Sequence, residues 1–414
     1  MIYGIRNKNG LSMLLNSILW LLVWGGMFTD IGRLSSSFLF SNPLSFVQGI
    51  RAIFPILALY MILIWILGSR SEFPLAKNPL RFLLFYCLMG IIVSIFLSPD
   101  IVTSLYWAGL YTSPLFVMWI LLEKPNALAS LRMIININFG VSAILALLIL
   151  PQVFQGQTFD EGRAGFYNLP FNLGRMRANG VGRFALILII FSTVRFMSKK
   201  NRARYIYLGI IFPSLYILAR SQSRTALLGL AVGCILFILM KHADWRFVFA
   251  GPIAAYVIWI SGIQWRAQGR FDNLVNLTGR QMTWERALDL IKQSPFLGWG
   301  FHADRLLVNS EHMHNSYLHA MIQSGLIGTV AFIAAFIGIW RIIIKNNLIG
   351  RIYYFQGPDQ GVLMESILLL GFMTARSFFE STGAFYGVDL LIIVPSIAFI
   401  HLWTVKNIRM HAQP

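Results

Sequence analysis

Histidines gather immediately before a long apolar segment in the last third of the chain. They are His302, His312, His314 and His319. An imidazole is the side chain best matched to removing a proton from a hydroxyl group at neutral pH, so one of them could act as a general base. A metal site is a second possibility, because His312 and His314 flank a single residue. The five-residue step from His314 to His319, however, suits one helical face poorly.

A structural role is the third possibility for this stretch. His314, Asn315 and Ser316 precede the apolar segment, where polar side chains commonly cap the first N–H groups of a helix. Gly325 and Gly328 follow at a spacing that permits close helix packing. The residue types alone leave these three alternatives open.

Arginines form the second group that could do chemistry. Arg220 and Arg224 bracket a predicted turn in ARSQSRTALLGL, and Arg376 follows an apolar run in TARSFFES. A guanidinium binds a phosphate or carboxylate at two points, and a charge at the membrane boundary is costly unless it is paired or used. The alternative is that these arginines bind lipid headgroups or pair with acidic residues. The acidic candidates are Asp160, Glu161, Asp272, Glu285 and Asp304.

The elements that must position these groups are membrane helices. Of the 414 residues, 57% are hydrophobic and 12% are charged, whereas an ordinary soluble protein is about one quarter charged. A spanning helix needs about 20 mostly apolar residues. The sequence predicts an all-α polytopic protein with twelve spans in a single membrane domain, 1–414. The predicted spans are 11–29, 52–68, 82–98, 101–122, 133–150, 183–197, 205–219, 225–240, 247–263, 318–340, 361–375 and 388–404.

Short basic loops predict the orientation, because Lys and Arg are retained on the cytoplasmic side. Both termini and four basic loops are then cytoplasmic. The loops are 69–81, 199–204, 241–246 and 341–351. The longer loops 151–182 and 264–317 fall on the outer, periplasmic face. Fourteen of the fifteen basic residues on that face are Arg, a bias that indicates an anionic, phosphate-bearing ligand there.

The loop 264–317 contains the clearest local element outside the membrane. RQMTWERALDLIKQ has apolar residues near helical spacing, which predicts a short amphipathic helix lying on the membrane surface. Ser294 and Pro295 end it, and FLGWGF then supplies Gly298 and Gly300 for a tight turn. We expect this periplasmic loop, between spans nine and ten, to be the catalytic loop.

These motifs together resemble the hallmark of the O-antigen ligase and polymerase family of bacterial envelope glycosyltransferases. The family's pattern is H-[NSQ], nine residues, then G-x-x-[GTY]. His314 and Asn315 are followed by SYLHAMIQS and then by GLIG at 325–328, which fits this pattern. Upstream, LTGRQMTWERALDLIKQSPFLGWGF resembles the family's G-R-x-x-x-W segment with its P-x-x-G-x-G turn. SQSRTALLG resembles its arginine signature.

The resemblance implies a multi-pass enzyme of the bacterial inner membrane with its site facing the periplasm. Such an enzyme moves a glycan from undecaprenyl diphosphate to an acceptor sugar with inversion, and uses neither a metal nor another cofactor. His314 corresponds to the family's essential histidine, the proposed base, and Arg224 and Arg280 correspond to its diphosphate-binding arginines. Further candidates for substrate binding are Arg177, Arg220, Arg286, Arg376 and Asn315.

The surroundings of the base are expected to be cationic. Arginines close to an imidazole favour its neutral form and can take up the charge of a departing diphosphate. Paired carboxylates of the glycosidase type do not stand out in the sequence.

The expected partners are the lipid-linked donor, an acceptor and membrane lipids, without nucleic acid. The acceptor is left open between lipid A core, as for a ligase, and a growing polysaccharide, as for a polymerase. A transporter or flippase of lipid-linked oligosaccharide is an alternative function, and a non-enzymatic polysaccharide co-assembly factor is another. The transporter is less favoured, because transporters carry functional charges near the membrane midplane, whereas the charges here gather at predicted outer boundaries.

Overall fold

The computed structural model describes residues 2–411 except for 30, 42, 69–73, 157–165, 171–174, 200, 241–279, 309–311, 356 and 358. The chain forms two compact units. The first unit comprises Met1–Ile137, Gly279–Ile342 and Ser377–Pro414, and the second comprises Asn138–Thr278 and Ile343–Arg376. Because the units alternate along the chain, this division is not one between consecutive domains. The single membrane domain stays a prediction.

Long apolar helices make the protein nearly all-α and multi-pass. Within the described residues, six helices are long and apolar enough to cross a membrane. They are α5 (Leu80–Leu97), α6 (Ile101–Leu122), α7 (Ala127–Gln155), α8 (Ala178–Ser198), α15 (Ser316–Lys345) and α18 (Val388–His411). A seventh crossing results if α3 (Pro43–Arg51) and α4 (Phe54–Gly68), which meet at a bend of 40°, act as one span.

The predicted all-α membrane fold is confirmed, and eleven of the twelve predicted spans coincide with helices. The remaining span, 247–263, lies outside the described residues. Besides α4, which qualifies only together with α3, four of the eleven helices do not qualify as full spans by length and composition. They are α1 (Ile2–Gly25), α9 (Tyr205–Ser221), α10 (Arg224–Met240) and α17 (Asp359–Arg376). The count of twelve and the cytoplasmic termini therefore stay predictions.

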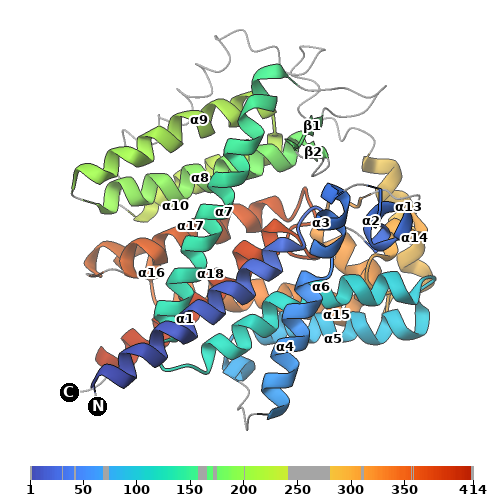
Figure 1. Ribbon diagram of the computed structural model, residues 1–414, viewed down its shortest axis with the longest axis horizontal. Helices are drawn as coiled ribbons and strands as arrows, with labels where there is room; N and C mark the ends of the chain where they lie inside the picture. Colours follow the sequence, from blue (N-terminus) through green and yellow to red (C-terminus); the bar gives the residue numbers. More distant parts are fainter. Residues whose placement is uncertain are drawn as a thin grey trace. The chain divides into compact units, whose positions relative to one another are not determined.

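Buried aromatic side chains form the centre of the first unit. Tyr86 of α5 contacts Tyr111 of α6, Phe332 of α15 and the loop residue Phe301, with ring centroids 5.4, 5.5 and 6.0 Å apart. Gly90 of α5 lies beneath Phe301, where an added Cβ would come within 2.4 Å of the ring. This packing fixes the histidine-bearing loop against α5 and α6, which lie side by side (Figure 1).

Hydrogen bonds from Thr103 mark the start of α6. The carboxylate of Asp100 accepts the N–H and the hydroxyl of Thr103, at 3.0 and 2.6 Å, as an N-cap does. These bonds hold the pKa of Asp100 below its ordinary value.

The remaining elements of the first unit are η1 (Ile31–Leu34), α2 (Ser36–Leu39), η2 (Pro74–Lys77), α13 (Arg280–Gln293) and α14 (Ala303–Leu307).

Helix α13 begins and ends at the predicted residues, but its apolar residues serve two surfaces. Ala287 is buried, and Leu290 and Ile291 pack against the same cluster. Met282 and Leu288, in contrast, are exposed. The helix is therefore fastened to the first unit along one face, and contact of its exposed apolar residues with the membrane surface stays a prediction.

The second unit is built around the hairpin of α8 and α9, with α10 alongside (Figure 1). Helix α10 packs closely against α17, since a Cβ at Gly229 would come within 2.1 Å of the Phe372 ring. Arg195 of α8 pairs with the buried Glu365 of α17, with Nε 2.7 Å from Oε1. The other elements are the antiparallel strands β1 (Phe166–Asn168) and β2 (Arg175–Arg177), η4 (Arg202–Arg204), α16 (Leu348–Arg351) and η6 (Ile352–Tyr354).

Helix α15 is interrupted near its N-terminal end. The turn at residues 295–300, which contains Gly298 and Gly300, packs into the interruption. Ser324 and Gly325 have non-helical backbone angles. The N–H groups of Trp299 and Gly300 donate to the carbonyls of residues 322 and 323, at 2.7 and 2.9 Å. In return, the carbonyl of Pro295 accepts the N–H of residue 326 at 2.8 Å. The turn thus supplies backbone partners that the broken helix lacks.

Gly325 therefore has a different role from the close helix packing that its spacing predicted. Its φ is 58° and its ψ is −163°, a conformation that residues with a Cβ rarely adopt. A Cβ at this position would lie 2.2 Å from the carbonyl carbon of Phe296. The glycine permits the approach of the 295–300 turn instead of the approach of another helix.

Candidate functional site

His314 ends a chain of three linked side chains in the first unit. Its Nδ1 lies 2.9 Å from Oε2 of Glu380, and Oε1 of Glu380 lies 3.2 Å from Nη2 of Arg280. Arg280 also donates through Nη1 to the carbonyl of Phe379, at 2.8 Å. The structure thus brings together His314 and Arg280, both predicted for catalysis, with a carboxylate between them.

The carboxylate determines which nitrogen of a neutral His314 carries the proton. An ionised carboxylate only accepts hydrogen bonds, so Nδ1 of His314 donates to Glu380. The lone pair then lies on Nε2, which becomes the basic atom of the ring. Arg280 fixes the carboxylate through a charge-assisted hydrogen bond. A carboxylate that orients an imidazole in this way is the arrangement of an activated general base.

Asn315 fastens the start of α15 to the loop that carries Glu380. Its Oδ1 accepts the N–H groups of Tyr317 and Leu318, at 2.9 and 3.0 Å. Its Nδ2 donates to the carbonyl of Phe378, at 3.0 Å. The capping role that the sequence allowed is therefore confirmed for Asn315, and its role in substrate binding stays a prediction.

Ser316 makes a second connection between the same two segments. Its N–H donates to the carbonyl of Ser377 at 2.9 Å, and its hydroxyl lies 2.8 Å from the carbonyl of Glu380. Ser316 is buried, so these bonds are shielded from water. The hydrogen bonds from Asn315 and Ser316 to the backbone of residues 377–380 therefore fix the position of the Glu380 carboxylate relative to His314.

His312 adjoins His314 through an unambiguous hydrogen bond. The backbone N–H of His314 can only donate, so Nδ1 of His312, at 3.2 Å, accepts. Neutral His312 therefore carries its proton on Nε2. The ring centroids of the two histidines are 5.0 Å apart. Among the residues that the structure describes, no group of three or more His, Cys, Asp or Glu side chains is arranged to hold a metal ion.

The other predicted arginines make none of the contacts that link His314, Glu380 and Arg280. Arg286 is exposed on α13 of the first unit. The remaining four belong to the second unit, on β2, α9, α10 and α17. They are Arg177, Arg220, Arg224 and Arg376. Their convergence on His314 stays a prediction.

Glu380 is the site residue that sequence reasoning missed. We expected arginines beside the imidazole and named no carboxylate there, but the group on Nδ1 is a carboxylate and Arg280 contacts its other oxygen. The one local signal is an acidic residue at the end of TARSFFES, where an unpaired charge would be costly. That signal does not indicate that Glu380 pairs with His314, because 66 residues separate the two in the sequence.

Two comparisons show what this chain is similar to, and the first covers the segment that contains His314. A family model described as O-antigen ligase matches residues 208–333. The exopolysaccharide production protein ExoQ of Rhizobium meliloti (strain 1021) is 28% identical over 155 residues. That match covers 30% of this chain and 35% of the relative. Residues 208–333 are therefore similar to the O-antigen ligase family, and the chain spans about a third of the length of the relative.

Proposed function

We propose that this protein is a membrane glycosyltransferase that moves a glycan from undecaprenyl diphosphate to a hydroxyl group of an acceptor sugar. The observation that carries the proposal is the chain from Arg280 through Glu380 to Nδ1 of His314, which leaves Nε2 as an oriented base. The similarity of residues 208–333 to the O-antigen ligase family supports the substrate class. The proposed site faces the periplasm from the bacterial inner membrane.

His314 begins the proposed reaction by accepting a proton. Nε2 takes the proton of the acceptor hydroxyl while the acceptor oxygen forms a bond to the anomeric carbon of the donor. The bond from that carbon to the diphosphate oxygen breaks, and its electron pair leaves with undecaprenyl diphosphate. Glu380 stabilises the imidazolium that forms, and the proton later passes to water. Attack opposite the leaving group inverts the anomeric centre.

Arginines are proposed to bind the diphosphate and to stabilise its developing charge. Arg224 and Arg280 take this role, because a guanidinium contacts two phosphate oxygens at once. Arg280 already makes two hydrogen bonds to the loop after α17. A guanidinium has five N–H donors, so these bonds do not exhaust it. Preorganised cations of this kind act where charge develops in the transition state.

The acceptor that the comparisons favour is a growing polysaccharide. The similar protein from Rhizobium meliloti is named for exopolysaccharide production. Lipid A core is the other acceptor, since the matching family model is that of an O-antigen ligase. The two acceptors require separate assays, because donor and base are the same for both.

The test is transfer by the purified protein in liposomes that contain an undecaprenyl-diphosphate-linked repeat unit, with each acceptor in turn. His314→Ala is expected to lower kcat by roughly 10²- to 10⁴-fold, the usual contribution of a general base. His401→Ala is the matched control. His401 lies on α18 and hydrogen-bonds to Asn78, so its loss should leave transfer unchanged.

Other outcomes would contradict the proposal. Equal transfer by His314→Ala and the wild type would remove the base from the mechanism. Movement of the donor across the bilayer without transfer would favour a transporter or flippase. Transfer is expected to continue at an unchanged rate in EDTA, whereas its loss would show that a metal takes part.

A further inference from the structure

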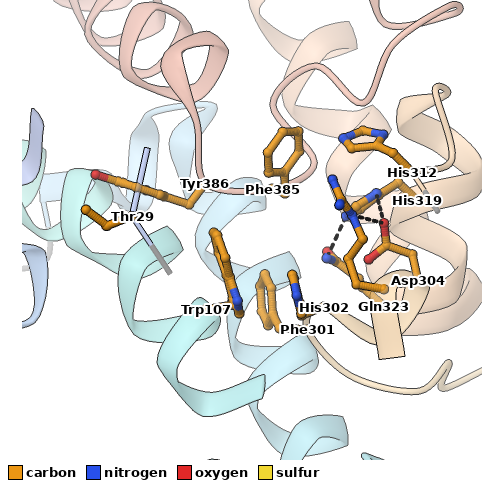
Figure 2. A pocket seen from close by; sticks show the side chains of 11 residues that line it. Thr29, Trp107, Phe301, His302, Asp304, His312, His319, Gln323, Phe385 and Tyr386 are labelled. Carbon is orange, nitrogen blue, oxygen red and sulfur yellow. Dashed lines mark hydrogen bonds and ion pairs between the residues drawn. The ribbon is translucent and has the colours of Figure 1, made fainter. Parts of the chain in front are cut away.

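A cavity of about 410 Å³ lies in the first unit (Figure 2). Its size falls within the range of about 300–1,000 Å³ for sites that hold small ligands. Trp107, His302 and Phe385 line it with flat rings, and Asp304 and His312 add polar groups. Neither His314 nor Glu380 lines it, so it is separate from the chain of groups that orients the base.

Stacked rings form one wall of the cavity. The rings of Trp107 and His302 have centroids 4.7 Å apart and planes 8° from parallel. His302 has a φ of 63°, in the left-handed region. A residue with a side chain is held there only when its surroundings require it. The backbone is therefore strained in the conformation that stacks this imidazole on Trp107.

A buried carboxylate lies opposite this wall. Asp304 is 0% exposed, and neither of its oxygens makes a hydrogen bond within the described part of the chain. The nearest partners are Nδ1 of His319 at 3.3 Å, drawn as a dashed line in Figure 2, and the charged Arg305, whose Nε lies at 3.8 Å. Buried acceptors without hydrogen bonds are costly and call for an explanation. Hydroxyl groups of a ligand would supply the missing donors.

Three other polar side chains of the cavity, His319, Gln323 and Tyr386, already have partners. Nε2 of His319 lies 2.7 Å from Nε2 of Gln323, and the other end of that amide accepts the hydroxyl of Tyr86. Burial raises the pKa of Tyr386 well above its ordinary value, so its hydroxyl stays protonated and donates to the carbonyl of Val23. Asp304 is therefore the group best placed to accept hydrogen bonds from a ligand.

The cavity lies at the end of the helices where His314 is found. Trp107 is in the second turn of α6, His319 is in the first turn of α15, and Tyr386 precedes α18 by two residues. His312 lines the cavity, and its ring centroid is 5.0 Å from that of His314. A ligand in the cavity is thus separated from the base by one imidazole ring.

We propose that this cavity binds a neutral sugar ring of the acceptor, and the proposal rests on the function proposed above. The apolar C–H face of a pyranose lies against the wall of Trp107 and His302, and its hydroxyl groups donate to Asp304. A diphosphate is disfavoured, because the cation in the lining, Arg305, already lies next to Asp304, and the buried carboxylate would repel the phosphates. A lipid chain is disfavoured as well, since it would leave Asp304 without donors.

The test separates binding from transfer by using the acceptor alone. The probe is a single repeat-unit oligosaccharide cut from the surface polysaccharide of the source organism, with binding to the purified protein followed by saturation-transfer NMR. We expect saturable binding to the wild type and to His314→Ala, which lacks the base but keeps the cavity. Trp107→Leu and Asp304→Asn are expected to show no saturable binding of the oligosaccharide. Trp119→Leu is the matched control, because Trp119 is half-buried on the same helix outside the cavity.

The transfer assay adds a second readout. Trp107→Leu and Asp304→Asn are expected to raise the acceptor KM about tenfold or more, as the loss of a stacked contact or of a buried hydrogen-bond acceptor implies. Their kcat at saturating acceptor should stay within about twofold, since the base is intact. Thermal unfolding in detergent checks that each variant is folded.

Two results would overturn the proposal that the cavity binds a sugar ring of the acceptor. One is an absence of saturable oligosaccharide binding to the wild type at millimolar concentration. The other is wild-type binding by both folded variants, Trp107→Leu and Asp304→Asn. Failure of the proposed transferase function is a different outcome: binding would then follow the expected pattern while no glycan is transferred to any acceptor.

Discussion

His314 is held in a backbone conformation that residues with side chains seldom adopt. Its φ is 48°, in the left-handed region, at a cost on the order of 1–3 kcal/mol for a residue other than glycine. The N–H of His314 bonds to His312, and Asn315 and Ser316 tie the next residues to the loop at 377–380. These bonds offset the strain and fix the direction of the imidazole.

Glu380→Gln tests the carboxylate that orients this imidazole. The change keeps the size of the side chain but offers an amide, which cannot stabilise an imidazolium. We expect kcat to fall on the order of 10²- to 10⁴-fold, as when the acidic member of a catalytic triad becomes an amide. Acceptor KM should change little, because Glu380 does not line the cavity. A kcat close to that of the wild type would show that Glu380 only holds the loop.

Arg224→Lys tests two-point binding of the diphosphate. A lysine keeps the charge but replaces a planar fork with a single ammonium. Donor KM should therefore rise about tenfold or more, the effect of losing a charge-assisted hydrogen bond. The control is Arg202→Lys, an exposed arginine of η4. Unchanged kinetics of Arg224→Lys would argue against phosphate binding at this position.

At the scale of elements, the interruption of α15 explains the spacing of the sequence motif. Residues 316–323 form a short half-helix between His314 and Gly325. The turn at 295–300 enters the break, and Gly298 there has φ 76° with Ile322 and Ser324 closely packed around it. The nine residues between Asn315 and Gly325 therefore set the distance from His314 to the interruption of α15, which the turn at 295–300 holds in place.

Gly325→Ala tests this anchor. The new Cβ would meet the carbonyl of Phe296 at 2.2 Å and require a strained φ, so the break and the turn could not both persist. We expect a large loss of folded protein in the membrane, measured by the yield of monodisperse protein in detergent. Gly338→Ala, on the same helix, is the control. Its Cβ would come no closer than 3.4 Å to Pro79, and alanine favours a helix. Equal yields of the two variants would contradict the role of the break.

At the scale of the whole molecule, the predicted orientation places the catalytic loop outside and the basic loops inside. Lys292 on α13 and Lys77 in η2 are both exposed and are predicted to lie on opposite sides of the membrane. Both native cysteines lie on helices, Cys87 buried and Cys234 half-buried. A cysteine introduced at either lysine should therefore react in preference to them.

Labelling of Lys292→Cys and Lys77→Cys tests the orientation. In intact spheroplasts, a membrane-impermeant maleimide is expected to label Lys292→Cys and to leave Lys77→Cys unlabelled until the cells are opened. The unaltered chain gives the background from the native cysteines. Labelling of Lys77→Cys in intact spheroplasts would place the termini and the site on the sides opposite to those predicted.

The sequence by itself determined the membrane-helical class, most of the helix positions and the bounds of α13. These features depend on local apolar length and periodicity, which a chain carries without its neighbours. The spacing around His314 was sufficient to indicate the family, and Arg280 was predicted for the site. The exchange of backbone bonds between the glycine turn and α15 was not predicted, because a glycine's spacing does not reveal which segment approaches it.

Only the tertiary structure decided which charges meet. Glu380 reaches His314 and Arg280 across 66 and 100 residues of sequence, and Asp304 lies against His319 and lines one cavity with Trp107. Such partners carry no periodic signal, because a buried carboxylate needs only one well-placed cation or donor and the chain can supply it from any segment. Their pairing therefore follows from the packing of α13, α15 and the loop before α18.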